Sequence, residues 1–362
     1  MSIITSAEAF LIDIPVETVR TDSVQAFLKQ ETPIVRIKTA DGLEGIGYSY
    51  TIGTGGTAVL ALLRDYLIPK LVGMDSQYIE KVWNEIYYST RATETGAISS
   101  LAVAAIDTAI WDLKCKRSNQ SLALAAGGFR DRVPLYDTEG GWLHLTTEEL
   151  VAGAKSSKEK GWPGVKLKVG KANVHEDVDR LEAVRATVGP SMHIMVDANT
   201  SLTLAEAKRR AKAFEPLDLF WFEEPMPADD VMAHAALVKS TSIPIAVGET
   251  MYSAMQFQQY LHQDAVGIVQ VDVARVGGIT PWLKVAHMAE AFNVKVCPHF
   301  LMEIHVSLTA AIPNGLYVEH IPQLRGITHT QMKIENGHAL APTTPGLGID
   351  WNFDAIDKLR AS

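Results

Sequence analysis

From residue 133 onward the chain repeats one pattern, in which a short apolar segment is followed by an amphipathic stretch of about three helical turns. The apolar segments are rich in Val and Ile and almost continuously hydrophobic, which is typical of parallel strands buried on both faces. The expected strands are Val133–Thr138, Gly164–Gly170, His193–Asn199, Leu219–Pro225, Ile243–Glu249, Gly267–Val273, Val294–His299 and Leu316–His320. Such alternation, repeated about eight times, predicts a closed (β/α)8 barrel. An open doubly wound sheet fits less well, because no Gly-x-Gly-x-x-Gly follows an early strand.

The first 130 residues follow a different pattern. Ile3–Pro15 and Thr32–Thr39 alternate like strands, and Asp41-Gly42 leads into a third such run, which indicates a hairpin. Helical spacing then takes over as far as Lys116. We therefore predict an α/β protein with a modified (β/α)8 TIM-type barrel and an α+β capping domain formed by both ends of the chain. The predicted division is 1–130 for the N-terminal capping part, 131–325 for the catalytic barrel and 326–362 for a C-terminal segment that returns to the cap.

Charge and cysteine content exclude several classes of partner. Lys and Arg number 33 against 42 Asp and Glu, a net charge of −9, whereas sequence-independent binding to nucleic acid or to an anionic membrane needs a basic surface. Residues 1–14 lack the features of a signal peptide, and no uncharged apolar run of 18 residues occurs. Cys115 and Cys297 are too few for a disulfide framework. We expect a cytoplasmic protein without nucleic-acid or membrane partners.

Nearly every predicted barrel strand ends in a residue that can do chemistry. Active sites of such barrels lie at the C-terminal ends of the strands. One charged residue at a strand end is most simply a solvated residue that begins a loop, but the same feature at strand after strand predicts a site. The residues are Asp137, Thr138, Lys166, Lys168, Asp197, Asn199, Glu223, Glu224, Glu249, Asp272, His299 and Glu319.

Three of these carboxylates predict a metal site. Asp197, Glu223 and Glu249 end the third, fourth and fifth strands at intervals of 26 residues, so they should be neighbours around the barrel mouth. Clustered carboxylates repel one another unless a cation is present, and an all-oxygen donor set suits Mg²⁺, or alternatively Mn²⁺. No nearby Cys or paired His favours Zn²⁺. The alternative is a surface rim of acids paired with Lys or Arg. Glu224 should point to the other strand face and act as a structural neighbour.

Two further groups could carry protons. Lys166 and Lys168 alternate with apolar residues, which places both side chains on the lumenal face of the barrel. Their mutual repulsion beside a cation should lower the pKa of at least one of them and make an amine available as a base. Asp272 and His299 end the next two strands and could form a carboxylate–imidazole dyad. A histidine satisfied within the core is the alternative for His299.

Seven segments together resemble the enolase superfamily, in its mandelate racemase / muconate lactonizing enzyme family and mandelate racemase subgroup: VKLKVG, MVDAN, WFEEP, VGE, VDVARVGGIT, CPHF and YVEH. The resemblance implies that Asp197, Glu223 and Glu249 are the metal ligands and that Lys168 is the general base. It implies that Lys166 and Glu319 contact the substrate carboxylate, that His299 with Asp272 is the second acid/base, and that Asn199 is a polar neighbour of the metal. Thr138 corresponds to a hydroxyl at the first strand end, although the following loop, 139–144, is longer here.

The same resemblance implies that Mg²⁺ and a base remove the α-proton of a small carboxylate substrate, giving an enediolate. Because loops Val16–Glu31 and Tyr50–Gly56 are polar, we expect an acid sugar (an aldonate or aldarate) and its dehydration to a 2-keto-3-deoxy acid. The open alternatives are racemisation or epimerisation of a 2-hydroxy acid and cycloisomerisation of a sugar-acid lactone or anhydro sugar acid.

Further expectations concern the surroundings of the site. Trp142 and His144 are expected to line the pocket, and the chain is expected to form a homo-oligomer. A non-catalytic binding protein and a phosphate-binding enzyme based on Gly53–Gly56 are the other classes. The phosphate site is disfavoured because no Lys-Ser/Thr follows the glycines. An amino-acid racemase of the superfamily would carry a lysine on the sixth strand, where Asp272 stands.

Overall fold

The computed structural model describes residues 2–93 and 96–360. The N-terminal part contains a three-stranded antiparallel sheet of β1 (Ile4–Ile14), β2 (Gln30–Thr39) and β3 (Glu44–Tyr48) in that order. The predicted Asp41-Gly42 turn joins β2 to β3, with Gly42 in the left-handed region at φ 83°. Helical segments follow at α1 (Gly56–Leu62), a π-helical turn (Leu63–Leu67), α2 (Ile68–Leu71), α3 (Ile79–Thr90), α4 (Ala97–Arg117) and α5 (Leu122–Ala125).

Helix α4 is the packing centre of this part. Its residues are buried on almost every side, as its alanine-rich sequence predicts. It lies directly on β3, where a Cβ at Gly45 or Gly47 would come within 2.3 Å of the α4 backbone at Ala109 or Ala105. Glycine at these two positions therefore lets the helix and the sheet approach closely.

The barrel contains eight parallel strands in the described residues. They are β4 (Arg132–Asp137), β5 (Gly164–Lys168), β6 (His193–Asp197), β7 (Trp221–Glu223), β8 (Ile245–Val247), β9 (Ile268–Val269), β10 (Lys295–Val296) and β11 (Val318–His320). Each of β4 to β9 pairs in parallel with the next strand. Val296 of β10 forms a parallel β-bridge with Gly315, which lies just before β11. Strand β11 in turn pairs in parallel with β4, the first strand of the barrel. Every predicted strand is present, with ends shortened where the chain turns into the site.

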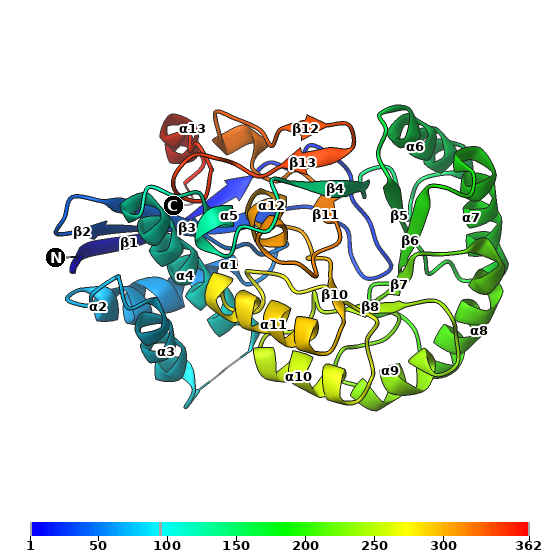
Figure 1. Ribbon diagram of the computed structural model, residues 1–362, viewed down its shortest axis with the longest axis horizontal. Coiled ribbons are helices and arrows are strands. Elements are labelled where there is room, and N and C mark those ends of the chain that lie inside the picture. Colours follow the sequence, from blue (N-terminus) through cyan, green and yellow to red (C-terminus); the bar gives the residue numbers. More distant parts are fainter. Residues whose placement is uncertain (1, 94–95, 361–362) are drawn as a thin grey trace.

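Helices separate the strands. They are α6 (Thr147–Glu159), α7 (Val174–Val188), α8 (Leu204–Phe214), α9 (Val231–Val238), α10 (Ala254–His262), α11 (Ile279–Ala291) and α12 (Met302–Ala311), with a 3-10 turn (Glu215–Leu217) after α8. Figure 1 shows α6, α7 and α8 along the right-hand edge of the barrel and α9 and α10 below it. Side-chain caps such as Thr146 and Asn173, each within a capping box, begin these helices at defined residues. None of the described helices is long and apolar enough to cross a membrane.

The C-terminal segment contacts both parts of the molecule (Figure 1). After a 3-10 turn (Arg325–Ile327), β12 (Ile334–Glu335) and β13 (His338–Leu340) form a hairpin that adds antiparallel to β4 of the barrel. The chain then reaches α13 (Phe353–Lys358) beside the cap, where Trp351 packs edge-on against Tyr48 and the Arg36 guanidinium lies over Phe353.

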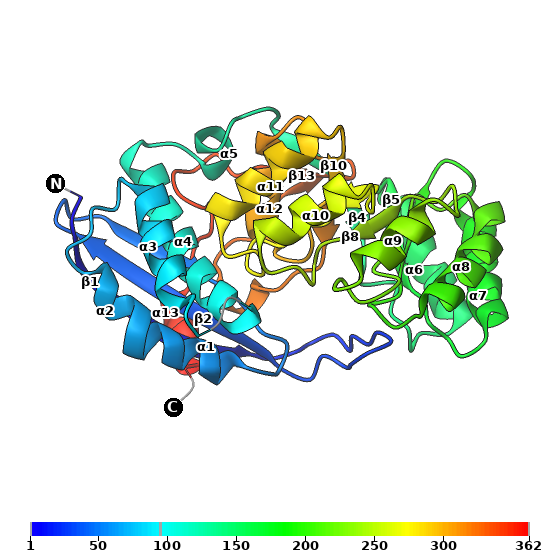
Figure 2. The same ribbon diagram turned by 90° about the horizontal axis from the view of Figure 1, so that it is seen from below.

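A long excursion of the cap reaches the barrel mouth. Figure 2 shows the connection between β1 and β2, residues 15–29, extending from the capping sheet toward the green half of the barrel. Two polar contacts anchor it there: the Ser23 hydroxyl donates to the Ala198 carbonyl over 2.7 Å, and Thr21 Oγ1 lies 2.8 Å from His144 Nδ1. The loop therefore lies over the C-terminal ends of the first barrel strands.

Candidate active site

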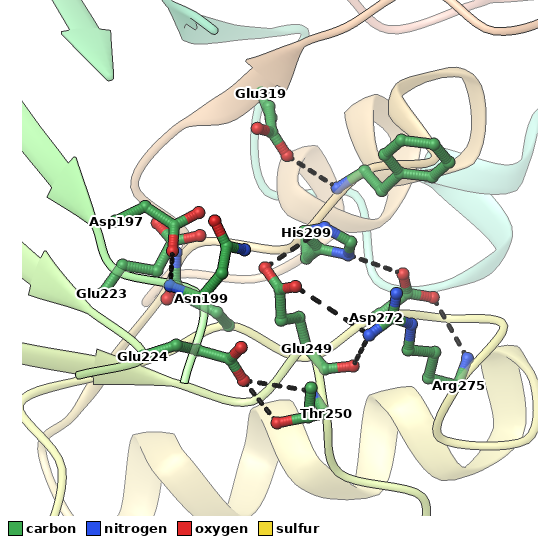
Figure 3. Close-up of polar contacts among 12 residues, drawn as sticks. Asp197, Asn199, Glu223, Glu224, Glu249, Thr250, Asp272, Arg275, His299 and Glu319 are labelled. Atoms are coloured by element: carbon green, nitrogen blue, oxygen red, sulfur yellow. Dashed lines mark hydrogen bonds and ion pairs between the residues drawn. The ribbon is translucent and has the colours of Figure 1, made fainter. Parts of the chain in front are cut away.

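The three predicted metal ligands meet at one point in the barrel mouth. Asp197 and Glu223 end β6 and β7, and Glu249 follows β8 by two residues (Figure 3). The side chains are 0%, 0% and 6% exposed, and one oxygen from each lies within 4.8 Å of the others. The alternative of a solvated acidic rim is wrong, because these carboxylates are buried.

The surroundings of the triad fit a divalent cation. Glu319 joins it, so that three buried carboxylates, Asp197, Glu223 and Glu319, share the ammonium groups of Lys166 and Lys168, while Glu249 lies near His299. Burial, reinforced by repulsion from Asp197, raises the pKa of Glu223 well above its usual range. The buried Asn199 Oδ1 accepts no hydrogen bond from the described residues. A cluster of buried carboxylate oxygens beside such an amide oxygen is the donor set that Mg²⁺ prefers.

Lys166 and Lys168 both point into the barrel, as their alternation predicts. Lys166 Nζ lies 2.7 Å from Glu223 Oε1 and 3.0 Å from Glu319 Oε1, and Lys168 Nζ contacts Asp197. The pKa depression is expected beside a bound cation, whose charge would offset that of the carboxylates. Without the cation, burial lowers the pKa of each lysine, but attraction to Glu223 outweighs burial at Lys166 and attraction to Asp197 outweighs it at Lys168, so both pKa values are raised.

His299 and Asp272 form the predicted dyad beside Glu249 of the triad (Figure 3). His299 Nδ1 lies 2.8 Å from Asp272 Oδ2, and its Nε2 lies 3.2 Å from Glu249 Oε2. Burial raises the pKa of Asp272, but the hydrogen bond and charge of His299 outweigh it and bring that pKa to about 2. Because an ionised carboxylate only accepts, Nδ1 carries a proton and Nε2 is the atom available for proton transfer.

Glu319 is held by three groups. Thr138 Oγ1 donates to its Oε1 over 2.7 Å, the Phe300 amide donates to its Oε2 over 2.8 Å, and Lys166 completes the set. Burial raises its pKa, but attraction to Lys166 and the other contacts lower it far below the usual range. The backbone amide of Asn199 donates to Asp197 Oδ1 over 2.8 Å. All ten predicted site residues are thus brought together, and Thr138 both lines the cavity and donates to Glu319.

The backbone turns sharply after the site residues of three strands. Asn199, Glu224 and Phe300 have φ values of 44°, 40° and 68°, a region that residues other than glycine seldom adopt and that clusters at functional sites. Glu224 was expected to be structural, and its Oε1 does accept from the amide and hydroxyl of Thr250, which ties the ends of two strands together. Its other oxygen is buried without a partner, and the residue also lines the cavity.

These side chains surround a cavity of about 110 Å³. Its outer wall comes from both predicted cap loops and includes Asp22, Val24, Gln25, Phe27 and Ile52. The loops were expected to make a polar wall, but three of these five residues are apolar. Trp142 lines the cavity as predicted and packs against Phe27 with ring centroids 5.6 Å apart. His144 does not line the cavity: it lies outside and contacts Thr21.

Comparison with known families agrees with this geometry. Residues 149–355 match the family described as "Enolase C-terminal domain-like", and residues 4–126 match "Mandelate racemase / muconate lactonizing enzyme, N-terminal domain". The chain is a member of the enolase superfamily. The resemblance inferred from the seven sequence segments is therefore confirmed, as is the fold class of a barrel with a capping domain.

Individual members of the superfamily are similar over most of their length. L-talarate/galactarate dehydratase of Salmonella typhimurium is 36% identical over 87% of this chain and 79% of its own. The 3,6-anhydro-alpha-L-galactonate cycloisomerase of Streptomyces coelicolor is 34% identical over 96% of this chain and 97% of its own. The crystal structure of L-talarate dehydratase from Polaromonas sp. JS666, complexed with Mg and L-glucarate, superposes with a TM-score of 0.95 at 36% identity, covering 100% of this chain and 98% of that one.

Two residues of this enolase-superfamily site were not predicted individually. The Tyr50 hydroxyl, at the end of the capping sheet, donates to Asp272 Oδ2 over 2.7 Å. Arg275 donates from Nε to that hydroxyl over 3.0 Å and from Nη1 to the Glu249 carbonyl over 2.8 Å. Together they connect the dyad to the backbone of Glu249. Tyr50 begins a predicted cap loop and Arg275 lies within VDVARVGGIT, but no sequence spacing indicates that the two would meet.

Proposed function

We propose that this chain is a Mg²⁺-dependent hydro-lyase that dehydrates an acid sugar to a 2-keto-3-deoxy acid. The observation that carries the proposal is that Lys168 and His299 line one cavity beside the buried acidic triad, where Lys168 contacts Asp197 and His299 lies 3.2 Å from Glu249. The similarity to a dehydratase over 87% of the chain supports the same reaction.

The residues that would bind Mg²⁺ and the substrate carboxylate have separate roles. Asp197, Glu223 and Glu249 would hold Mg²⁺, which supplies positive charge to the substrate carboxylate as the α-proton leaves. Lys166 and Glu319 contact the same carboxylate, Thr138 orients Glu319, and Asn199 orients Asp197. Mn²⁺ would serve the same donor set.

The proton transfers use the two groups that line the cavity, Lys168 and His299. Lys168 would take the α-proton as the free amine, a form that a bound cation would favour by offsetting the charge of Asp197, and the C–H electron pair delocalises into the carboxylate to give the enediolate. His299 donates its Nε2 proton to the β-hydroxyl, the C–O bond breaks with its electron pair, and water leaves. The resulting enol takes up a proton at C3 and becomes the 2-keto-3-deoxy acid. Asp272 keeps the imidazole oriented and stabilises its protonated form.

A second candidate reaction has a specific observation in its favour. The similarity to a cycloisomerase extends over 96% of this chain and 97% of that enzyme, which is more complete than the dehydratase match. In that reaction the leaving group would be a ring oxygen, and His299 would protonate it in the same position. Racemisation or epimerisation would instead return a proton from His299 to Cα.

A screen of acid sugars with Mg²⁺ in D₂O, followed by proton NMR, separates these reactions. Dehydration gives a 2-keto acid. Loss of the α-proton signal without a keto product would contradict dehydration and support epimerisation, and a ring-opened product from an anhydro sugar acid would support cycloisomerisation. Chelation of Mg²⁺ with EDTA should stop all three, and re-addition should restore them.

The proposal extends to the organisation of the protein. The division into 1–130, 131–325 and 326–362 is supported by the contacts of Trp351 and Phe353 with the capping sheet. A homo-oligomer is supported by Val19 and Leu28, which are 67% and 87% exposed on the cap loop and would be covered by a second copy. The two cysteines, Cys115 and Cys297, are free and buried, which supports the proposal that the protein is located in the reducing cytoplasm.

A further inference from the structure

Two buried polar side chains next to the acidic triad have no part in the proposed proton transfers. Trp221 lies two residues before Glu223 on β7, and the alternation of a strand places both side chains on the same face. Gln270 directly follows β9, the second strand along from β7. Trp221 and Gln270 are each 0% exposed and neither lines the cavity, so their contacts are with other side chains of the site.

Both side chains donate to the same oxygen of Glu223. Trp221 Nε1 lies 2.8 Å from Glu223 Oε2, and Gln270 Nε2 lies 2.7 Å from it. The other oxygen, Oε1, lies 2.7 Å from Lys166 Nζ. A carboxylate has about two acceptor positions on each oxygen, so both positions on Oε2 are filled and Oε1 keeps one position for a cation.

The other two carboxylates of the triad are held differently. Asp197 Oδ2 contacts Lys168, and Glu249 Oε2 lies 3.2 Å from His299 Nε2. Lys168 and His299 move protons in the proposed reaction, so their charges change as it proceeds. The indole and amide groups that bind Glu223 Oε2 stay neutral, and this oxygen therefore stays anchored throughout.

The two donors are themselves held in place. The Trp221 ring meets that of Tyr136 edge-on, with centroids 5.3 Å apart and planes at 86°. The backbone amide of Gln270 donates to the Val247 carbonyl of β8 over 2.9 Å. Side chains constrained in this way orient the carboxylate that they bind, as the outer partners of metal ligands generally do.

The Gln270 amide is costly to bury. Its Oε1 is buried and accepts no hydrogen bond from the described residues. A buried acceptor without a partner destabilises the folded state, and a methionine of similar length would fill the same space without that cost. The hydrogen bond to Glu223 is therefore what a glutamine adds at this position.

The number of oxygens that Glu223 offers affects the choice of metal. Mg²⁺ needs near-octahedral coordination at short distances and keeps several water molecules, whereas the larger Ca²⁺ takes about six to eight oxygens and often binds a carboxylate through both of its own. With Oε2 occupied, Glu223 offers one oxygen. Without the two donors it could turn and offer both, which would favour Ca²⁺.

We propose that Trp221 and Gln270 are positioning residues that hold Glu223 as a one-oxygen ligand and so make the site selective for Mg²⁺ over Ca²⁺. The proposal rests on the proposed function, because it takes the acidic triad as the metal site, and it adds how that site selects its metal.

Calorimetric titration of the full chain with Mg²⁺ and with Ca²⁺ tests the proposal. Trp221→Phe and Gln270→Met each remove one donor and keep a side chain that fills much of the same space. We expect the Kd for Mg²⁺ to rise by about tenfold or more in each variant. The Kd for Ca²⁺ should rise less, so the ratio of the Ca²⁺ Kd to the Mg²⁺ Kd should fall by about threefold or more, and furthest in the double variant.

Gln323→Met and Trp111→Phe are matched controls, in which both Kd values should stay unchanged. Gln323 is buried, its Oε1 also lacks a partner among the described residues, and its Nε2 donates to the Ile321 carbonyl over 3.0 Å. Trp111 is buried, and its Nε1 donates to Thr280 Oγ1 over 2.9 Å. Each control thus removes a buried donor of the same kind that does not bind the triad.

Two results would overturn the proposal and leave the proposed function standing. One is an unchanged Mg²⁺ Kd in both Trp221→Phe and Gln270→Met. The other is an equal rise in the two Kd values with an unchanged ratio, because a general loosening of the site weakens both metals alike. If the unmodified protein binds no Mg²⁺ with or without an acid sugar, the metal site of the proposed function is wrong, and the proposal is wrong with it.

Discussion

The barrel and the cap contribute to the site in different ways. Barrel residues such as Asp197, Glu223 and Asp272 are completely buried, and each is held by contacts from neighbouring strands. The wall residues of the cap lie on a long connection, where Val24 and Gln25 are exposed. A rigid framework positions groups that transfer protons, whereas an exposed loop can change its side chains at little cost to the fold. The difference assigns chemistry to the barrel and substrate selection to the cap.

The sharpest test of the barrel's role removes the proposed base. Lys168→Ala should lower the rate of α-proton exchange at least ~10³-fold, because a positioned base contributes about 10²–10⁴. Exchange in D₂O, followed by proton NMR, measures this loss directly. Lys158→Ala, on the exposed face of α6, is the control. Exchange at the normal rate in Lys168→Ala would remove Lys168 from the mechanism.

A substitution of His299 should separate the role of the dyad from that of the base, and its expected effect is the second largest. His299→Asn should lower formation of the keto acid by about 10²-fold or more while Lys168 still exchanges the α-proton, because the proposed mechanism uses a different group for each transfer. Isotope exchange and product formation are measured in the same NMR sample. Equal losses in exchange and product would show that one group performs both transfers.

One hydroxyl tests how far the cap takes part in the chemistry. Tyr50→Phe removes the bond to Asp272 and leaves Arg275 Nε without its acceptor, so we expect kcat to fall about tenfold, the equivalent of ~1.4 kcal/mol. Tyr48→Phe is the matched control, because the Tyr48 hydroxyl is buried and makes no hydrogen bond with the described residues. A kcat that is equal in the two variants would confine the chemistry to the barrel.

The contact between cap and barrel should have a modest pH signature. Asp107 of α4 accepts from the amide and hydroxyl of Thr280 at the start of α11, and burial raises its pKa to about 7. Between pH 4 and 7 the folded protein therefore holds a proton that the unfolded chain has lost, so stability falls as pH rises, by at most about 1.4 kcal/mol per pH unit. Urea unfolding at several pH values should show a smaller slope in Asp107→Asn. An unchanged slope would place the titration elsewhere.

The barrel was the predictable half of the molecule. Its strands carry a continuous apolar pattern, and strand ends in a parallel barrel meet at one mouth, so Asp197, Glu223 and Glu249 could be placed together from their spacing alone. The cap wall was only partly predictable. The loops were identified, but their polar composition concealed the fact that Val24, Phe27 and Ile52 face inward. The direction in which a loop side chain points has no sequence period.

The lysine pKa shows the same limit within the barrel. Alternation placed Lys166 and Lys168 on one face, and repulsion between them was the only interaction that their spacing revealed. The carboxylates that raise both pKa values when no cation is bound are Glu223, Glu319 and Asp197, on other strands. An electrostatic sum depends on every charge nearby in space, and local sequence contains only a few of them.

The amino-acid sequence by itself determined the barrel, the cap, the acidic triad and the positions of Lys168 and His299, because each follows from a period or from a residue at a strand end. Only the tertiary structure decided that Tyr50 and Arg275 join the dyad to Glu249, that Thr138 donates to Glu319, and that Arg20 and Lys29 are paired away from the cavity. These contacts join segments up to 302 residues apart, and their distances depend on how the whole chain packs.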